Sequence, residues 1–452
     1  MSNVVSKELI EKVRELLESH DDNLLLETIE DMHAADIAEI MEHISIDEAK
    51  EIYLLLDGEK GADVLLEIPE DELKRFLKVL PPEVIANQFI NNMDSDDATD
   101  VIGLLNDDDK QQVLGSLEDL EQAGDIVDLL EYDEDSAGGL MAKELVSVNE
   151  NLNVQECLKE IAKQAEDVDE VYNVYVVNDD NILKGVLSLK SLISNPTNTK
   201  ISTLYNNEVY SVRTEMQDEE VAQMMEKYDL VAIPVVDGIG RLKGRITIDD
   251  IVDVIREEAE KDLQMAAGLT GEIHAGTRPW AMARSRIPWL LIGMIGGLCG
   301  SSVIGSFQEI ITKMPSIMAF IPLIAAMAGN MGIQSSSIVV QSLAMGNDHI
   351  SLAKRLSKEL LVAIFIALIF GILIFLYADF IKGDMTLAFS LSLSLIVVML
   401  YASVFGTIVP IVLNSIKIDP AVATGPFITT TNDIVGLTIF FTVSAMVYNA
   451  ML

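Results

Sequence analysis

The segment DPAVATGPFITTTNDIVG (residues 419–436) places an aspartate, Asp433, inside a stretch of membrane composition. An aspartate within a bilayer costs roughly 3 kcal/mol even on the lenient insertion scales, so it persists only where it faces protein or water. Asp433 is therefore a candidate for an ion or proton pathway. The alternative is an acid near the start of a helix, where the helix dipole favours a negative charge.

Five apolar segments, each long enough to cross a hydrocarbon core of ~30 Å, make up the C-terminal part of the chain. They are residues 287–311, 315–343, 359–381, 385–415 and 426–452. We expect the N-terminus to lie in the cytosol, because the first residues lack the apolar core of a secretory signal. Seven basic residues then fall inside, namely Arg278, Arg284, Arg286, Lys354, Arg355, Lys358 and Lys417. Only Lys313 and Lys382 fall outside, so the positive-inside rule favours a cell (inner) membrane protein with its C-terminus outside.

The charge of the chain is concentrated before these segments. The full sequence has 31 Lys and Arg against 72 Asp and Glu, and the excess of acids lies in the first 275 residues. Such a surface argues against nucleic acid as a partner, because phosphates require a basic face. Carboxylates are ligands for Mg²⁺ and Ca²⁺, although solubility alone also explains a net charge. The two cysteines, Cys157 and Cys299, suggest neither a disulfide framework nor a zinc site.

Residues 1–132 are predicted to form an acidic domain of α-helical repeats. One phrase recurs as ADIAEIM (35–41), ADVLLEI (62–68), ATDVIGLL (98–105) and AGDIVDLL (123–130). Repeats of about this length are typical of helical solenoids. Each phrase is expected at a helix start, so that capping is the plainer role of its acid. These acids are Asp36, Asp63, Asp100 and Asp125.

Two copies of one unit follow a glycine-containing segment (131–141) that we expect to act as a hinge. VYVVNDDNILKGVLSLKSLI (174–193) aligns without gaps on IPVVDGIGRLKGRITIDDIV (233–252). Each copy is a strand, a turn, a second strand and a helix start, and each is preceded by a helix. This order resembles paired CBS domains, expected at 142–200 and 201–250. A long acidic connecting helix (251–276) then leads to a transmembrane domain (277–452). The fold class is thus a multidomain membrane protein with helical, α+β and five-helix transmembrane parts.

The second apolar segment contains PLIAAMAGNMGIQSSSIVVQSLAMG (322–346), which is unusually polar. Gly329-Asn330-Met331-Gly332 is expected to open the helix and expose carbonyl oxygens, which a membrane tolerates only beside protein or water. The alternative is that these small and polar residues join helices to one another.

These features together resemble the MgtE family of magnesium channels and transporters over nearly the whole chain. The resemblance rests on the acidic repeats, DSAGGLM (135–141), the CBS pair, and the segments PLIAAMAGNMGIQSSS and DPAVATGPFITTTND. It implies a homodimer in the lipid bilayer, with the pore between two membrane domains and Asp433 contributed twice. Mg²⁺ dehydrates reluctantly, so a wide polar filter is expected. The further lining candidates are Gly329, Asn330, Gln334 and Thr429.

The resemblance also implies a gate in which acids of the helical domain, the CBS pair and the connecting helix share Mg²⁺ in the closed state. The matching positions are Asp63, Asp96, Asp100, Glu219, Asp229, Asp250, Asp253, Glu258, Asp262 and Asp419. Lys261 falls where the family's connecting helix can carry an acid. High cytosolic Mg²⁺ is thus expected to close the channel. For each acid taken alone, a solvated surface is the alternative.

Nucleotide binding by the CBS pair is doubtful from the sequence. Asp249 in GRITID fits the place where CBS domains contact a ribose. However, Asn173 and Leu230 stand where aromatic residues would stack on adenine, which argues against ATP.

Two other classes of function compete with a channel. A membrane-anchored sensor that conducts nothing would need neither Asp433 nor the polar second segment. An ion-coupled exchanger of divalent cations remains open, because one intramembrane acid serves a channel or an exchanger. No enzyme is expected, because the histidines are scattered and no HExxH or glycine-rich phosphate loop occurs. The order of preference among Mg²⁺, Mn²⁺, Co²⁺ and Ca²⁺ does not follow from the sequence.

Overall fold

The computed structural model describes residues 5–165, 168, 171–270, 279–344, 351–423 and 425–451. The chain divides into two compact units, residues 1–255 and residues 256–452. Arg278 and residues 271–276 of the expected connecting helix lie outside the described residues.

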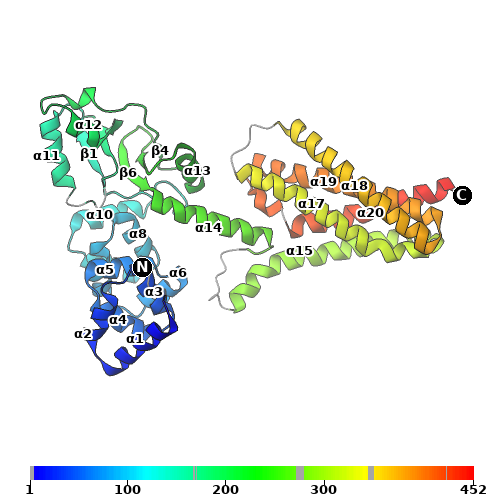
Figure 1. The fold of residues 1–452 in the computed structure, drawn as a ribbon, viewed down its shortest axis with the longest axis horizontal. Coiled ribbons are helices and arrows are strands. Elements are labelled where there is room, and N and C mark those ends of the chain that lie inside the picture. Colours follow the sequence, from blue (N-terminus) through cyan, green and yellow to red (C-terminus); the bar gives the residue numbers. More distant parts are fainter. Residues whose placement is uncertain are drawn as a thin grey trace. The chain divides into compact units, whose positions relative to one another are not determined.

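The first unit begins with α-helices, coloured blue to cyan in Figure 1. They are α1 (Lys7–Ser19), α2 (Asp22–Ile29), α3 (Ala34–Glu42), α4 (Ile46–Leu55), α5 (Gly58–Leu66), α6 (Glu70–Leu77), α7 (Pro82–Val84), α8 (Ser95–Gly103), α9 (Asp107–Ser116) and α10 (Leu120–Leu129). A π-turn (Ile85–Phe89) and a 3-10 turn (Ile90–Asn92) separate α7 from α8. The core contains Tyr53, whose ring centroid lies 5.0 Å from that of Phe76 and 4.5 Å from that of Phe89. The predicted run of helices is confirmed.

The predicted capping role of the repeated aspartates is wrong for three of the four. Asp63, Asp100 and Asp125 are each the sixth residue of their helix, and the helices begin one and a half turns earlier. The residues at the N-cap positions are instead Asp57, Asp94 and Asp119. Asp36 does lie in the first turn of α3, where the N-cap is His33.

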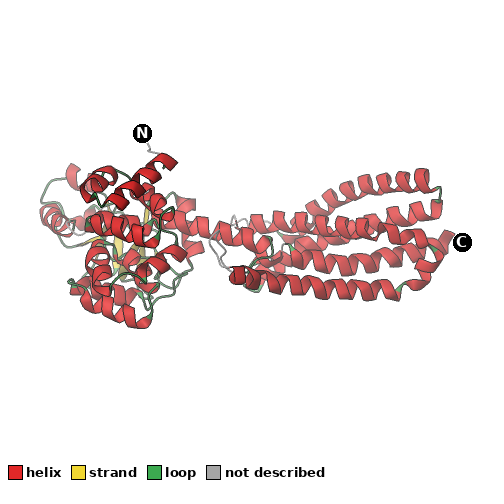
Figure 2. Ribbon diagram, turned by 90° about the horizontal axis from the view of Figure 1, so that it is seen from below, coloured by secondary structure: helices red, strands yellow, loops and turns green. Residues whose placement is uncertain are grey.

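Two β-α-β-β-α units complete the first unit. The first contains β1 (Val146–Asn149), α11 (Val154–Gln164), β2 (Val174–Val177), β3 (Leu183–Leu187) and α12 (Leu189–Ser194). After a 3-10 turn (Ile201–Thr203), the second contains β4 (Val212–Arg213), α13 (Asp218–Tyr228), β5 (Ala232–Val236), β6 (Leu242–Thr247) and α14 (Ile248–Ala266). In both sheets the first strand pairs in parallel with the second, and the second pairs antiparallel with the third. The predicted order of elements is confirmed, and Figure 2 shows how few strands stand among the helices.

In each of these units, the third strand pairs with the segment that precedes the first strand of the other unit. Ala142 precedes β1, yet it exchanges two backbone hydrogen bonds with Arg245 of β6. Asn206 precedes β4 and exchanges the corresponding pair with Val186 of β3. The glycine next to each strand residue leaves room for the incoming backbone. A Cβ at Gly185 would lie 2.2 Å from the oxygen of Asn206, and one at Gly244 would lie 2.6 Å from that of Ala142.

The segment predicted as a hinge is instead packed onto the second β-α-β-β-α unit. The amide of Ala137 donates to the oxygen of Met216 (2.7 Å), and that of Gly138 donates to Thr214 (3.0 Å). A Cβ at Gly139 would lie 2.4 Å from the oxygen of Asp133, so this glycine allows a close turn. Several backbone bonds and buried side chains fasten the segment, which the composition alone did not indicate.

Within its described residues, the second unit contains five helices that are long and apolar enough to cross a membrane. They are α15 (Pro279–Ser306), α17 (Ile321–Ala344), α18 (Leu352–Lys382), α19 (Met385–Ser415) and α20 (Pro426–Met451). Shorter elements are α16 (Gln308–Lys313) and 3-10 turns at Pro315–Phe320 and Pro420–Ala423. The five predicted spans are confirmed, although α15 ends at Ser306 rather than 311 and α18 begins seven residues earlier than expected.

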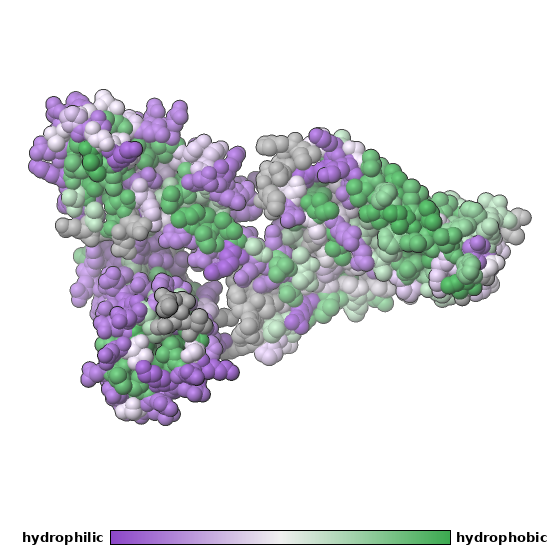
Figure 3. All heavy atoms as spheres, in the orientation of Figure 1, coloured by the Kyte–Doolittle hydropathy of each residue, from purple (hydrophilic) through white to green (hydrophobic). Residues whose placement is uncertain are grey.

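α19 forms the centre of this second unit and packs against α17, α18 and α20. Its contact face is rich in small residues such as Ala388, Ser394, Ala402 and Gly406, all buried. Small residues allow membrane helices to approach closely. The face of the second unit visible in Figure 3 is largely hydrophobic, as expected for helices surrounded by lipid.

Candidate ion-binding sites

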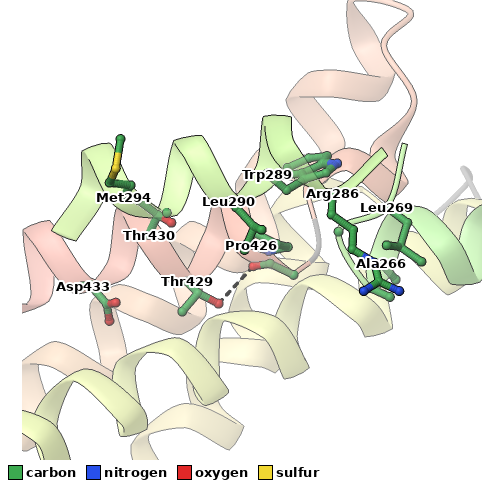
Figure 4. Close-up of a pocket in the computed structure, with 14 residues that line it drawn as sticks. Ala266, Leu269, Arg286, Trp289, Leu290, Met294, Pro426, Thr429, Thr430 and Asp433 are labelled. Atoms are coloured by element: carbon green, nitrogen blue, oxygen red, sulfur yellow. Dashed lines mark hydrogen bonds between the residues drawn. The ribbon is translucent and has the colours of Figure 1, made fainter. Parts of the chain in front are cut away.

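A cavity of about 950 Å³ in the second unit is lined by Asp433. It lies between the end of α14, α15 and α20 (Figure 4). In that view Asp433 lies at one end of the labelled residues, Arg286 lies near Ala266 toward the other end, and Thr429 and Thr430 lie between them. The rest of the lining is mainly apolar. A lone carboxylate with two threonines in such a cavity can attract a cation and offer it oxygen ligands.

Two glycines bring the end of α14 against the start of α20. Gly268 and Gly425 both have positive φ angles, 76° and 57°. A Cβ at Gly425 would lie 2.4 Å from the oxygen of Ala266, and one at Gly268 would lie 2.6 Å from the ring of Pro426. The helix that follows this contact carries Asp433 seven residues after its first residue, Pro426.

The prediction that Gly329–Gly332 opens the second span is wrong, because α17 is continuous from Ile321 to Ala344. The glycines serve packing instead. A Cβ at Gly332 would lie 2.0 Å from Nδ2 of Asn432, and one at Gly329 would lie 3.3 Å from Cγ2 of Thr429. Nδ2 of Asn432 also donates to the oxygen of Ala328 at 3.3 Å. The alternative, a polar interface between helices, is the one that the structure supports.

The five predicted pore residues therefore separate into three groups. Asp433 and Thr429 line the cavity, and Gly329 packs behind Thr429. Asn330 and Gln334 do not line it, and their side chains are exposed on α17. Asn432 was not predicted; it is fully buried, and its Oδ1 has no hydrogen-bond partner among the described residues. Its position next to Asp433 was the available signal.

In the first unit, a group of carboxylates gathers where α8 meets the start of α14; we call it the Asp96 cluster. Its members are Asp94, Asp96, Asp97, Glu144, Asp249 and Asp250. Ligand oxygens of Asp94, Asp96 and Glu144 all lie within 4.8 Å of one another, a spacing that suits a metal ion. Ser95 fixes one side, because its Oγ donates to Oε2 of Glu144 (2.7 Å) and accepts from the amide of Lys143 (2.8 Å).

Burial and mutual repulsion raise the pKa values of this cluster. Burial, followed by the charges of Asp97 and Asp250, raises the pKa of Asp96 well above its usual value. Burial and the charge of Asp250 raise the pKa of Asp97 to about 7. Burial also raises the pKa of Asp250, although the hydroxyl of Thr247 donates to it at 2.8 Å. Carboxylates held together in this way favour binding of either protons or a cation.

A smaller set, the Asp262 group, lies in the second unit and consists of Glu258, Asp262 and Asp419. Burial, followed by the charges of Asp419 and Glu258, raises the pKa of Asp262 to about 6. The ammonium of Lys261 lies 3.0 Å from Oε1 of Glu258. A lysine of the chain itself therefore neutralises part of this group.

The predicted regulatory acids are only partly brought together. Asp96 and Asp250 lie in the Asp96 cluster, and the charges of Asp100 and Asp253 act on it. Asp94, Asp97 and Glu144 were not predicted, although the run Asp94-Ser95-Asp96-Asp97 gave a local signal.

Three predicted acids belong to neither set among the described residues. Asp63 lies inside α5. Glu219 accepts a hydrogen bond from Gln223 (3.1 Å), and Asp229 ends α13 with a φ of 52°.

Asp249, predicted for a nucleotide, is the second residue of α14 and belongs to the Asp96 cluster. Asn173 and Leu230 are half-buried and present no aromatic ring. An aromatic side chain does stand next to Asn173, however. Tyr172 is 39% exposed, and the guanidinium carbon of Arg245 lies 5.9 Å from its ring centroid.

The five-helix unit and its half-buried acid, Asp433, place the chain in the class of divalent cation transporters. A family model with that description matches residues 321–443. The model of the MgtE intracellular N domain matches residues 32–135, and that of the CBS domain matches 137–197 and 201–257.

Two relatives of similar length have the same name. The chain is 30% identical to the magnesium transporter MgtE of Thermus thermophilus, over 75% of this chain and 76% of the relative. It is 32% identical to that of Enterococcus faecalis, over 72% of each. The chain therefore belongs to the MgtE family.

Two solved structures resemble the first part of the chain. The crystal structure of the soluble part of a magnesium transporter shares 32% identity with a TM-score of 0.50, covering 56% of this chain and 99% of that one. The cytosolic domain of the Mg²⁺ channel MgtE in complex with ATP shares 34% identity with a TM-score of 0.51, covering 54% and 99%.

Proposed function

We propose that this chain forms a Mg²⁺ channel in which Asp433 attracts the ion. Membership of the MgtE family supports the cargo, and the observation that carries the proposal is Asp433 with Thr429 and Thr430 along one cavity of the five-helix unit. A hydrated Mg²⁺ needs oxygen ligands rather than a tight cage, because it gives up its water reluctantly. The chain transports and does not catalyse a reaction.

Two copies are proposed to form the pore. Asn330 and Gln334 are polar residues in the middle of an apolar helix, and both are exposed on the single chain. Polar groups in a membrane helix normally face protein or water rather than lipid. A second copy whose α17 and α20 face these residues would place two Asp433 carboxylates around one path.

Cytosolic Mg²⁺ is proposed to close this pore by binding to the Asp96 cluster and the Asp262 group. Two carboxylates 4 Å apart repel by roughly 4 kcal/mol at an effective dielectric constant of 20. Cations would remove this repulsion and favour the compact arrangement of both groups. The contact of Gly268 with Pro426 and of Ala266 with Gly425 supports a mechanical link, because it joins the end of α14 to the start of the helix that carries Asp433.

The basic residues support a topology with the acidic unit in the cytosol. Arg284 and Arg286 near the start of α15, and Lys354 and Lys358 near the start of α18, belong to the same membrane face. The positive-inside rule assigns that face to the cytosol. The end of α20 then lies outside the cell (inner) membrane.

ATP binding between the CBS units is a second proposal, favoured by the nucleotide in a solved relative of the soluble part. Tyr172 offers this chain the exposed ring that the sequence analysis found missing at Asn173, and Asp249 would face the ribose. Calorimetric titration of ATP into the full chain tests the assignment. Tyr172→Ala would weaken binding, whereas binding unchanged in Tyr172→Ala and Asp249→Asn would refute it.

Mg²⁺ uptake into proteoliposomes tests the channel and the gate. Wild type and Asp433→Ala would be compared at nominally zero and at millimolar Mg²⁺ on the side of the acidic unit. The matched control is Asp379→Asn, an exposed acid at the far end of α18. We expect uptake that needs Asp433, tolerates the control and falls with Mg²⁺ on that side.

Other results of the same assay would contradict the proposed channel or its gate. No uptake in either condition would favour a sensor that conducts nothing. Uptake that requires a Na⁺ or pH gradient would favour a coupled exchanger. Full Mg²⁺ inhibition retained by the Asp250→Asn, Asp253→Asn double variant, with exposed Asp180→Asn as its control, would contradict the gate.

A further inference from the structure

A second carboxylate lies among the membrane helices, at Glu359 of α18. Its Oε1 accepts hydrogen bonds from Ser335 Oγ of α17 at 2.7 Å and from Ser403 Oγ of α19 at 3.3 Å. Both serines are buried, with exposed fractions of 1% and 0%. One carboxylate oxygen therefore joins three helices through two hydroxyl groups.

The three oxygens form a triangle of the size that a small hard cation requires. The two serine oxygens are 3.3 Å apart, so the sides measure 2.7, 3.3 and 3.3 Å. In an octahedral site, neighbouring oxygens are about 2.9 Å apart around Mg²⁺ and about 3.4 Å apart around a cation with ligand distances near 2.4 Å. The two 3.3 Å sides fall within this range, and the 2.7 Å side would have to lengthen by only about 0.2 Å to match the Mg²⁺ spacing.

The negative charge of Glu359 is a second reason to expect a bound cation. Among the described residues, the structure records no ion pair of Glu359, and both of its hydrogen bonds end on Oε1. Arg355, four residues earlier in α18, donates to Ser342 Oγ at 2.8 Å. Hydroxyl groups can donate to a carboxylate or turn their lone pairs to a cation, so the two serines suit an empty and an occupied site equally.

Glu359 lies at the same depth in its helix as Asp433 does in its own. Each acid comes seven residues after the first residue of its helix, Leu352 in α18 and Pro426 in α20. This is roughly 10 Å along the axis at 1.5 Å per residue. Since successive spans alternate in direction, α18 and α20 begin at the same membrane face. Both acids therefore lie in the first half of their helices, on the side of the membrane where α18 and α20 begin.

We propose that Glu359, Ser335 and Ser403 form a second cation site in the membrane unit, which takes a partly hydrated divalent cation. The inference rests on the proposed Mg²⁺ transport for the identity of the ion. Three protein oxygens with water completing the shell match the way in which Mg²⁺ is bound through one or two carboxylates. The bound ion ties α17, α18 and α19 together, and α17 carries the Gly329 and Gly332 faces against which α20 packs.

Crystals of the full chain grown with Mn²⁺ test this site, because anomalous scattering locates Mn²⁺ directly. We expect a peak about 2.0–2.6 Å from the Glu359 carboxylate in the wild type. The Glu359→Gln variant would lose this peak and keep any peak at the Asp96 cluster. Peaks at other acids with none at Glu359 in the wild type would overturn the proposal, and would leave the two serine bonds as a structural clamp.

A thermal measurement separates a cation site from a structural clamp without diffraction. Glutamine keeps an oxygen that accepts both serine protons, so Glu359→Gln should unfold at the wild-type temperature without divalent cations. We expect a smaller rise of Tm on adding Mg²⁺ in Glu359→Gln than in the wild type, with Asp379→Asn as the control. An equal rise in all three proteins would overturn the proposal. Failure of the proposed channel would show separately, as uptake that does not depend on Asp433.

Discussion

The Asp96 cluster and Asp433 bury acidic groups in opposite ways. In the cluster, several carboxylates raise one another's pKa values, and the guanidinium of Arg245 lies 3.9 Å from the carboxylate of Asp94. Asp433 instead lines a mainly apolar cavity whose described lining contains no second acid. Several carboxylates close together bind a cation tightly, which suits a sensor. A single charge holds it weakly, and conduction requires that an ion can also leave.

Removing the charge of Asp433 should have the largest effect. A unit charge at 4 Å contributes roughly 4 kcal/mol at an effective dielectric constant of 20, so Asp433→Asn should lower Mg²⁺ flux by on the order of 100-fold or more. Asp433→Glu keeps the charge and should retain more flux than Asp433→Asn. The initial rate of Mg²⁺ uptake measures both. Equal rates for the two variants would mean that shape, rather than charge, governs the site.

The close packing of α19 against α17 should be the next most sensitive feature. A Cβ at Gly406 would lie 2.4 Å from the backbone oxygen of Gly332, which cannot move aside as a side chain could. Gly406→Ala should therefore destabilise the membrane unit by about 1–3 kcal/mol, the usual range for overpacking. Thermal unfolding in detergent measures this. Gly297→Ala in α15 is the control, because nothing lies within 4 Å of its Cβ position.

The cluster should make stability depend on pH when Mg²⁺ is absent. The pKa of Asp97 is about 7 in the folded chain and close to its usual value when unfolded, so the folded chain holds its proton more tightly. The stabilisation is fully present below the unfolded pKa and is lost as the pH rises through about 7. A pKa difference of one between the folded and unfolded chain corresponds to about 1.4 kcal/mol of stability.

Calorimetry of the full chain with a chelator tests this dependence between pH 5.5 and 8. We expect Tm to fall as the pH rises, and Mg²⁺ to restore it most strongly at pH 8. Asp97→Asn should flatten the slope, with Asp180→Asn as the control. A Tm that rises with pH in the wild type would contradict the raised pKa of Asp97 as the source of the dependence.

The Asp262 group should give the smallest change. Lys261 already neutralises part of it, and partly exposed charge pairs contribute roughly 0.2–1 kcal/mol. Asp262→Asn should therefore raise the Mg²⁺ concentration that half-inhibits uptake by roughly two- to five-fold. Lys261→Gln should shift it in the opposite direction. Shifts in the same direction for both variants would show that the group does not act through its charge.

The sequence predicts elements whose signal is local. Five apolar segments of membrane length and the gapless alignment of residues 174–193 with 233–252 were enough to predict the spans and the paired units. The acids Asp63, Asp100 and Asp125 were placed wrongly because each follows a second acid by six residues, and that earlier acid occupies the N-cap position. The sequence pattern alone does not distinguish the acid at the N-cap from the acid six residues later.

Sites that depend on distant contacts were predicted least well. Gly332 resembles a helix breaker in isolation, and only the side chain of Asn432, 100 residues later, shows that it is a packing position. Likewise Glu144 joins Asp96 across 48 residues, and Glu359 meets Ser335 and Ser403 from three different helices. Such contacts are set by tertiary packing, which no local spacing encodes.

The exchange of leading segments between the two β-α-β-β-α units has a consequence for how this chain can be dissected. A cut near residue 200 would separate Asn206 from Val186 and Ala142 from Arg245 at once. Each excised half would then expose the backbone of its third strand, β3 or β6, together with the glycine beside it. An exposed strand edge of this kind invites aggregation. The smallest fragment that can be expressed or transplanted intact therefore contains both units, together with the linker that precedes each.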